Sequence, residues 1–235
     1  MIGIFASSKD DIKLLTEKSK IIKTMALGKS LVMEALLEGQ KVLLVITGYN
    51  KINLGIAAGY AGANYSLDAI IGLGNCGYLG NCDMKIGDLA LGVSSVQYSV
   101  DSSAIGFPKT VIPDVGRGVF CSDPQLVQLA QYACQEIGYQ YMGGRIATGE
   151  KFIANEKERD FIAKSYCCQF IDMECGGAGE VAFLMNIPVM FIKGISNYAN
   201  SNAPFDFERY ANLSNQRACN AALSMLKNMP SQFRF

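Results

Sequence analysis

The stretch from Phe170 to Asn200 reads FIDMECGGAGEVAFLMNIPVMFIKGISNYAN, and it decides the fold. Two apolar runs enclose an amphipathic middle. This pattern predicts a short strand ending at Met173, a helix over about 176–185 and a strand over 188–195. A strand, a crossover helix and a second strand form the repeating unit of a parallel α/β sheet. In such sheets, ligands bind at the carboxyl ends of the strands.

Polar residues stand at the carboxyl ends of both predicted strands. Glu174 follows the first strand, and Ser196 and Asn197 follow the second. The carboxylate of Glu174 can accept hydrogen bonds from two neighbouring hydroxyls, such as those of a ribose. From the carboxylate alone, a solvated acid that caps the following helix is the better-supported interpretation. We therefore expect a ligand site at this edge, with that alternative open for Glu174.

Length and charge narrow the class of protein. Half of the 235 residues are apolar, which predicts one large α/β domain over residues 1–235. The 21 basic and 21 acidic residues balance and are spread evenly, so neither nucleic acid nor an anionic membrane is an expected partner. The apolar run at 1–6 is too short for a signal peptide or a spanning helix, and we expect a cytoplasmic protein.

Cysteine and histidine usage limits the possible chemistry. The cysteines form no Cys-x-x-Cys pair and are expected to be reduced thiols, and no metal site is expected. The chain has no histidine, so acid and base groups must be carboxylates or water. No nucleotide-binding glycine loop is present, and no cofactor is predicted. The eight cysteines are Cys76, Cys82, Cys121, Cys134, Cys167, Cys168, Cys175 and Cys219.

Strands and helices alternate along the rest of the chain. The predicted fold is a three-layer α/β/α sandwich with a mixed, partly barrel-like central sheet. Residues 74–77, Gly-Asn-Cys-Gly, are expected to form a glycine-framed loop, and residues 101–119 an irregular segment. Further strands are predicted at 2–6, 21–26, 31–37, 41–47, 67–73, 86–96 and 141–148, and helices at 52–63, 123–137, 156–165 and 205–227.

Several sequence segments, in the same order along the chain, resemble those of one family, the nucleoside phosphorylase/nucleosidase superfamily. More narrowly, they resemble the 5′-methylthioadenosine/S-adenosylhomocysteine nucleosidases. Asp-Met-Glu at 172–174, followed about twenty residues later by Ile-Lys-Gly-Ile-Ser-Asn, carries the resemblance most clearly. The resemblance covers nearly the whole chain and implies the same fold. Further matching segments are Gly-Tyr-Asn-Lys-Ile at 48–52, Gly-Asn-Cys-Gly at 74–77, Lys-Ile-Gly-Asp at 85–88 and Thr-Gly-Glu-Lys-Phe-Ile at 148–153.

The resemblance implies roles for residues at the base and ribose of a nucleoside. Phe152 would stack on the purine, and the backbone of Ile153 would meet the purine edge. Met173 and Glu174 would hold the ribose. For Phe152, ordinary core packing is the alternative. Further substrate contacts are implied for Tyr49, Asn75, Lys193 and Ser196.

The resemblance also implies roles at the two ends of the reaction. Phe205 would cover the alkylthio group, and Ile105 would arrive from a second subunit, which implies a homodimer. Asp11 stands where the family keeps the Glu that activates water. The alternatives are core packing for Phe205 and a solvated acid in the first helical turn for Asp11.

Asn197 is the conspicuous departure from the family, which carries an Asp there. Cleavage of a purine N-glycosidic bond requires a proton for N7 and stabilisation of a cationic ribose while water attacks. A carboxamide can donate a hydrogen bond to N7 but has no proton to give. The other departures are Asp11 for Glu, Asn75 for Ser, Lys193 for Arg and Ser99 for His. Whether Asn197 is natural or introduced stays open.

The function implied by the resemblance is hydrolysis of 5′-methylthioadenosine, S-adenosylhomocysteine or a related adenine nucleoside. Adenine would be released, as in purine and methionine salvage, with activity impaired by Asn197. A purine nucleoside phosphorylase is the first alternative, but the chain has no Arg before Arg117 to hold phosphate. A nucleoside-binding protein with little or no activity is the second.

Overall fold

The computed structural model describes residues 1–80 and 84–230 of the chain. The strands are β1 Ile2–Ala6, β2 Lys20–Leu27, β3 Ser30–Leu37, β4 Gln40–Ile46, β5 Ala69–Tyr78, β6 Leu89–Gln97, β7 Val119–Cys121, β8 Tyr141–Thr148, β9 Phe170–Asp172 and β10 Val189–Asn197. The α-helices are α1 Lys13–Lys18, α2 Lys51–Asn64, α3 Pro124–Glu136, α4 Glu156–Tyr166, α5 Cys175–Met185 and α6 Ala203–Asn228; short 3₁₀ turns are η1 Asp10–Ile12 and η2 Ser103–Ile105.

The ten strands form one mixed sheet, part of which closes on itself. The strands β10, β6, β8, β9 and β5 are neighbours in that order, and β5 pairs again with β10, which closes a five-stranded ring. From β5 the sheet continues outward through β1, β4, β3 and β2. The predicted mixed, partly barrel-like sheet is therefore confirmed.

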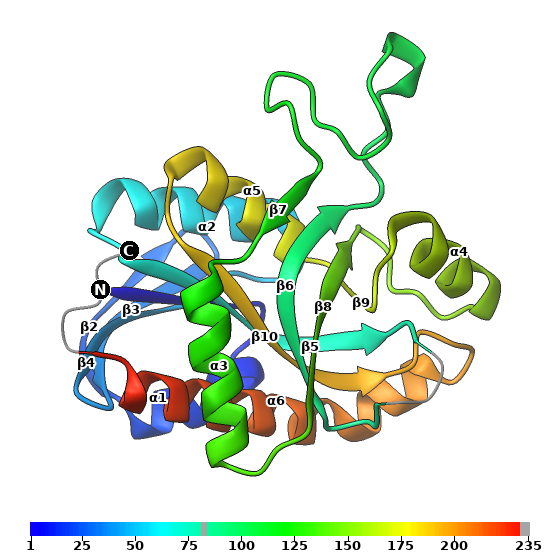
Figure 1. Cartoon of the computed structure of the whole chain (residues 1–235). Coiled ribbons are helices and arrows are strands. Elements are labelled where there is room, and N and C mark those ends of the chain that lie inside the picture. The colour runs from blue at the N-terminus through cyan, green and yellow to red at the C-terminus, as the bar shows by residue number, and fades with distance from the viewer. Residues whose placement is uncertain (81–83, 231–235) are drawn as a thin grey trace.

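Helices cover both faces of the sheet, as the three-layer prediction requires (Figure 1). One apolar core lies between the sheet and α1, α3 and α6, and a second lies between the sheet and the pair α2 and α5. The long helix α6 approaches β10 closely. A Cβ at Gly194 would lie 2.3 Å from the backbone oxygen of Ser214, so only glycine fits there.

The expected loop at residues 74–77 is wrong, because these residues continue β5. They pair in parallel with β10, with Gly74 opposite Lys193 and Gly77 opposite Asn197. The glycines serve close packing: a Cβ at Gly77 would lie 2.9 Å from the side-chain oxygen of Asn197. Likewise, Ser196 and Asn197 are the last residues of β10 and do not follow the strand. The polar groups at this edge are therefore held on paired strands.

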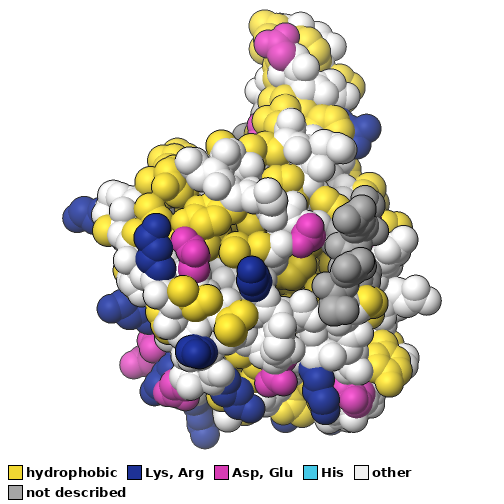
Figure 2. All heavy atoms as spheres, turned by 90° about the vertical axis from the view of Figure 1, so that its left-hand side faces the viewer, with side chains coloured by type: hydrophobic (Ala, Val, Ile, Leu, Met, Phe, Trp, Pro, Cys, Tyr) yellow, Lys and Arg dark blue, Asp and Glu magenta, His cyan; other side chains and the backbone are white. Residues whose placement is uncertain are grey.

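The irregular segment between β6 and β7, residues 98–118, projects from the body of the molecule (Figures 1 and 2). Ile105, at the end of η2 in this segment, is 72% exposed. In Figure 2 the projection forms the top of the molecule, and few of its visible side chains are charged. Within residues 1–80 and 84–230, no helix combines the length and apolar character needed to cross a membrane.

Candidate active site

A cavity opens where β5, β9 and β10 end, beside the start of α5. It collects most of the residues that the sequence predicted for the site, together with several that it did not. The lining residues are Ser7, Asp11, Tyr49, Gly74, Asn75, Cys76, Gly77, Lys151, Phe152, Ile153, Ile171, Asp172, Met173, Glu174, Lys193, Ser196, Asn197 and Phe207.

A buried ammonium group lies between two carboxylates in this cavity. Lys193 Nζ is 3.1 Å from an oxygen of Asp172 and 3.6 Å from an oxygen of Glu174, and all three side chains are buried. Burial alone lowers the pKa of Lys193, but the acidic groups around it raise the pKa well above its ordinary value. The lysine is therefore a fixed positive charge that two acids already neutralise.

Asp172 is held by the scaffold rather than left for a ligand. Its carboxylate accepts hydrogen bonds from Thr148 Oγ1 at 2.6 Å and from the backbone N–H of Cys175 at 3.0 Å. Together with the contact to Lys193, these bonds occupy the carboxylate and fix the start of α5. Asp172 was not among the predicted site residues, although this acid stands at a strand end directly before the predicted pair Met173 and Glu174.

Glu174 is the acid of this pair that is available to a ligand. It occupies the position before α5 but makes no side-chain capping bond there, so the reading of a helix cap is wrong. Burial raises the pKa of Glu174, and the charge of Lys193 opposes that rise. The carboxylate is thus oriented by Lys193 and keeps accepting capacity toward the cavity.

Asp11 is buried, so the reading of a solvated helix acid is wrong as well. Its carboxylate accepts the backbone N–H of Ser8 at 2.8 Å, and the Asp11 backbone N–H donates to Ser8 Oγ at 3.2 Å. Burial raises the pKa of Asp11, while the bond from Ser8 and the charge of Lys193 lower it. A Cβ at Gly74 would lie 3.5 Å from this carboxylate and 3.7 Å from Lys193 Nζ, so both groups approach the same stretch of β5.

Asn197 is buried and hydrogen-bonded on both sides of its carboxamide. Its Oδ1 accepts the backbone N–H of Ala199 at 3.0 Å, and its Nδ2 donates to Ser196 Oγ at 3.0 Å. Ser196 Oγ in turn donates to the backbone oxygen of Cys76 at 3.3 Å. The side chain therefore braces the turn at Ala199, and it lines the cavity at the same time.

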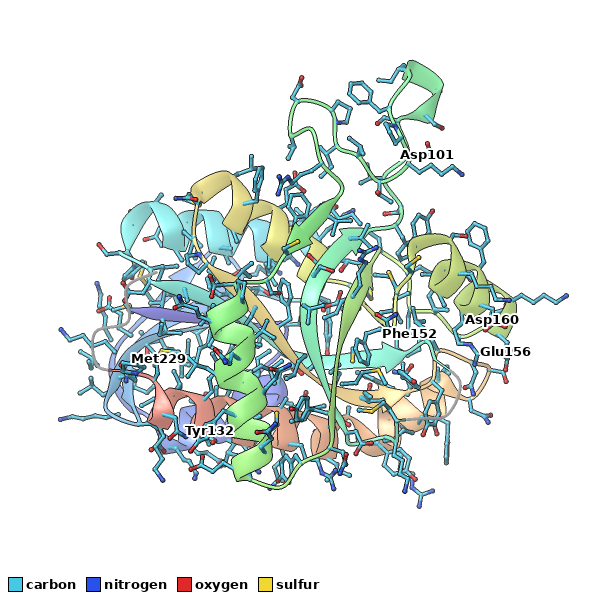
Figure 3. The ribbon with its side chains drawn as sticks, viewed as in Figure 1. Asp101, Tyr132, Phe152, Glu156, Asp160 and Met229 are labelled. Atoms are coloured by element: carbon cyan, nitrogen blue, oxygen red, sulfur yellow. The ribbon has the colours of Figure 1, made fainter. Side chains whose placement is uncertain are left out.

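Two aromatic rings close the other end of the cavity. Phe152 packs edge to face against Phe207, with ring centroids 5.7 Å apart. Phe152 is 42% exposed, so core packing does not describe it; it lies on the side of the molecule that carries α4 (Figure 3). Phe205 is 62% exposed and is not among the lining residues. Residues two apart on a helix point to opposite sides, and α6 begins at Ala203, so Phe207 faces the cavity in place of Phe205.

All but one of the remaining predicted site residues line the cavity, and the exception is Ile105. Tyr49 lines the cavity although it is 57% exposed, and Met173 and Ile153 line it as well. Asn75 lines it too, and its Oδ1 has no hydrogen-bond partner within the described part of the chain. Ile105 lies on the projecting segment, as Asp101 does in Figure 3, and does not reach this cavity.

Besides Asp172 and Phe207, Ser7 and Lys151 line the cavity without having been predicted. Lys151 stands beside the predicted Phe152, and its ammonium is 2.6 Å from a carboxylate oxygen of Glu158. Ser7 follows β1, a parallel strand, so its position was a usable signal. Among the described residues, no group of three or more Cys, Asp or Glu side chains has the arrangement of a metal site. Cys82 lies outside the described residues, and the other cysteines are free thiols.

A family model described as the phosphorylase superfamily matches residues 1–227. The chain belongs to this superfamily. The predicted resemblance is thereby confirmed. This phosphorylase-superfamily chain is 24% identical over 230 residues to the 5′-methylthioadenosine/S-adenosylhomocysteine nucleosidase of Staphylococcus carnosus, covering 97% of this chain and 100% of the relative. It is 24% identical over 229 residues to the aminodeoxyfutalosine nucleosidase of Campylobacter jejuni, covering 97% and 99%.

Among solved structures, this superfamily member is similar to the 5′-methylthioadenosine/S-adenosylhomocysteine nucleosidase of Neisseria meningitidis in complex with methylthio-immucillin-A. The TM-score is 0.93 at 22% sequence identity, covering 97% of this chain and 99% of the other. At this identity the likeness supports the fold.

Proposed function

We propose that the chain is an N-glycosyl hydrolase that binds an adenine nucleoside, 5′-methylthioadenosine or S-adenosylhomocysteine foremost, and releases adenine. The cavity supports this proposal because it has two chemically different ends. Acidic side chains line one end, and aromatic rings together with the backbone groups of Ile153 line the other. The curated relatives named above are nucleosidases of this kind.

The acidic end suits a ribose and an attacking water. Glu174 would accept the ribose hydroxyls, with Met173 against the sugar, and Asp11 would take a proton from water. In the reaction, the water oxygen bonds to the anomeric carbon as the bond from that carbon to N9 breaks. The proton passes to Asp11, and the departing purine gains one from solvent.

The aromatic end suits a purine. Phe152 would stack on the base, and Phe207 would cover the alkylthio side. The backbone N–H and C=O of Ile153 are buried and make no hydrogen bond within the described residues, so they are free to pair with the purine edge. Asn197 would donate to N7 without protonating it.

The charge at the acidic end of the cavity is the observation that favours hydrolysis over phosphorolysis. Lys193, the buried cation there, is already neutralised by Asp172 and Glu174, and Asp11 adds a third carboxylate. Lys151 is paired with Glu158, and none of the described lining residues is an arginine. A phosphate dianion would meet net negative charge, whereas water would meet a base.

The test is adenine release from 5′-methylthioadenosine in the presence and absence of phosphate. We expect the same rate in both buffers, followed over long times because Asn197 slows the reaction. Strict dependence on phosphate would place the chain among the phosphorylases. Calorimetric binding without any turnover would instead support the second candidate, a nucleoside-binding protein, which the missing acid at residue 197 favours.

We further propose a homodimer that works in the cytosol. Ile105 lies on a projection that its own cavity does not use, which supports a role at the cavity of a second copy. Cysteines that remain free and mostly buried support a reducing compartment. Purine and methionine salvage is the process that such a reaction would serve.

A further inference from the structure

Asn215 is a buried polar residue on α6, and it is not among the residues that line the cavity. The face of α6 that carries Asn215 packs against η1, which contains Asp11. Cys219, one helical turn further along, donates its thiol to the backbone oxygen of Asp11 at 3.1 Å. Residues four apart share one face of a helix. Asn215 therefore faces Asp11.

The sheet fixes the backbone of α6 at this point. Ser214 Oγ donates to the backbone oxygen of Ile195 at 2.7 Å. The Ser214 backbone also fills the space that a Cβ at Gly194 would need. Asn215 follows directly on this contact and is 3% exposed. Its side chain therefore has little freedom to leave Asp11.

The two ends of the Asn215 carboxamide have different surroundings. Oδ1 is buried and has no hydrogen-bond partner within residues 1–80 and 84–230. A hydrogen bond from the Asn215 side chain lowers the pKa of Asp11. An ionised carboxylate can only accept, so Nδ2 is the atom that donates to it. The amide thus serves Asp11 and leaves its own oxygen unpaired.

We propose that Asn215 is a positioning residue for the proposed reaction: its Nδ2 donates to the carboxylate of Asp11 and holds it, ionised, at the cavity. The inference rests on the proposed function, because it takes Asp11 to be the base that accepts a proton from water. It goes beyond that function because Asn215 lies outside the cavity and acts through Asp11 alone.

Other groups also act on the Asp11 carboxylate. Burial raises its pKa, and the backbone N–H of Ser8 and the charge of Lys193 lower it. Lys193 is shared with two other acids, and the Ser8 N–H belongs to the main chain. Asn215 is therefore a donor that a single substitution can remove. The titratable groups coupled to Asp11 are Lys193 on β10, Glu174 before α5, Tyr49 before α2 and Cys219 on α6.

The first measurement is the pKa of Asp11 in Asn215→Leu, which removes the donor and keeps the branched shape of the side chain. Labelling aspartate carboxyl carbons with ¹³C gives this pKa by NMR titration of the full chain, and Asp11→Asn assigns the signal by its loss. We expect a higher pKa for Asp11 in Asn215→Leu than in the unaltered chain, because the ionised form loses a donor.

The second measurement is adenine release from 5′-methylthioadenosine over a pH series. Residue 197 is an asparagine and does not titrate, so no acid at that position contributes to the profile. In Asn215→Leu, the midpoint of the acidic limb should move to higher pH, and turnover below it should fall about tenfold. KM should stay unchanged, because Asn215 does not line the cavity.

Two further variants keep the test decisive. Asn212→Leu makes the same change at an exposed residue of α6, and it should leave the pKa of Asp11 and the pH profile unchanged. Asn215→Ala removes the donor without adding apolar branches, and it should reproduce both shifts. Thermal unfolding of each variant checks that it folds.

Each other outcome has a definite meaning. An unchanged pKa of Asp11 in both Asn215 variants would overturn the inference, whatever the rates. A raised pKa with an unchanged pH profile would overturn it as well, while adenine release would leave the proposed function standing. No adenine release by any of these proteins or by Asn197→Asp would overturn the proposed function, and with it the role of Asn215.

Discussion

On the proposed function, Asn197 stands where the departing purine would need a proton donor. Asn197→Asp keeps the length of the side chain and adds a transferable proton. Positioned acid catalysis contributes about 10²–10⁴ in rate, so we expect turnover of 5′-methylthioadenosine to rise by about that factor. Affinity should change less, because a hydrogen bond to N7 is kept.

The measurement is adenine release at saturating substrate. Asn202→Asp, the same chemical change at an exposed residue before α6 that makes no side-chain capping bond, is the matched control. Equal turnover by Asn197→Asp and the unaltered chain would contradict the assigned role. It would also follow if the shorter acid at residue 11 had already removed the activity, and tight binding without turnover by both proteins would identify that case.

The buried carboxylate of Asp11 is expected to affect both the rate of the proposed reaction and the stability of the fold. Asp11→Asn removes the proposed base, and we expect the Asn197→Asp background to lose about 10²–10⁴ in rate. Because burial raises the pKa of Asp11, turnover should fall as the pH is lowered through that raised pKa, where the carboxylate takes up a proton. A rate that Asp11→Asn leaves intact would exclude Asp11 as the base.

The same pKa shift has the opposite consequence for folding. A raised pKa means that the native state holds this proton more tightly, so the stabilising contribution of Asp11 is present below the ordinary value of 3.8. It is lost as the pH rises through the raised pKa. We therefore expect Asp11→Asn to gain stability relative to the unaltered chain between acidic and neutral pH, measured by urea unfolding. A difference that is constant with pH would contradict this.

The close packing of α6 on β10 requires a residue without a Cβ at position 194. Gly194→Ala places a methyl group 2.3 Å from the backbone oxygen of Ser214, and neither element can move without disturbing the core. Overpacking of this kind costs about 1–3 kcal/mol, and more where backbone is the obstacle. Urea unfolding should register that loss.

Gly55→Ala is the matched control for this prediction. A Cβ there would make an ordinary contact of 3.9 Å with Val181, inside helix α2. It should be neutral or stabilising by up to about 1 kcal/mol, because alanine favours the helix. If the two variants were equally stable, the close packing of α6 on β10 would be wrong.

Most helices and strands could be predicted because their local pattern of apolar residues matches the side that each element buries in the fold. The apolar run at 188–195 and the amphipathic run at 205–227 correspond to β10 and α6 within a few residues. The prediction of a loop at residues 74–77 was wrong because two glycines in four residues favour a loop locally, whereas pairing with β10 and β9 extends the strand. Strand partners distant in sequence leave no local signal.

The site residues likewise divide into those that the sequence could predict and those that it could not. Glu174 and Asn197 could be found because polar residues at strand ends are a signal in parallel sheets. The choice of Phe205 over Phe207 could not be made correctly, since it depends on where helix α6 begins. The pairing of Asp172 with Lys193 joins the end of β9 to the middle of β10, two strands that each pair with β5, and the sequence does not specify that arrangement.

For the whole molecule, we expect a homodimer. Large apolar side chains stay exposed on the adjacent helices α2 and α5 and on the projection; they are Ile52, Ile56, Ile105, Phe183 and Leu184. A second copy would cover this surface and close the open side of the cavity. Light scattering at micromolar concentration should therefore give twice the mass of the chain.

A charge introduced at this surface should separate the subunits. We expect Ile56→Glu to shift the protein toward monomer and to weaken nucleoside binding, because the cavity loses its second wall. Tyr132→Glu adds the same charge on α3, across the sheet (Figure 3), and should leave the dimer intact. A monomeric unaltered chain with full nucleoside affinity would contradict the proposal.

The pairing of Asn197 with Gly77 across two strands has a genetic consequence. The backbone at residue 197 is fixed by the sheet, so Asn and Asp can replace each other there without rebuilding the main chain. Their codons differ only in the first base. On the proposed mechanism, a single point mutation therefore separates a lineage of slow hydrolases from a lineage of fast ones, and selection could cross that boundary in either direction.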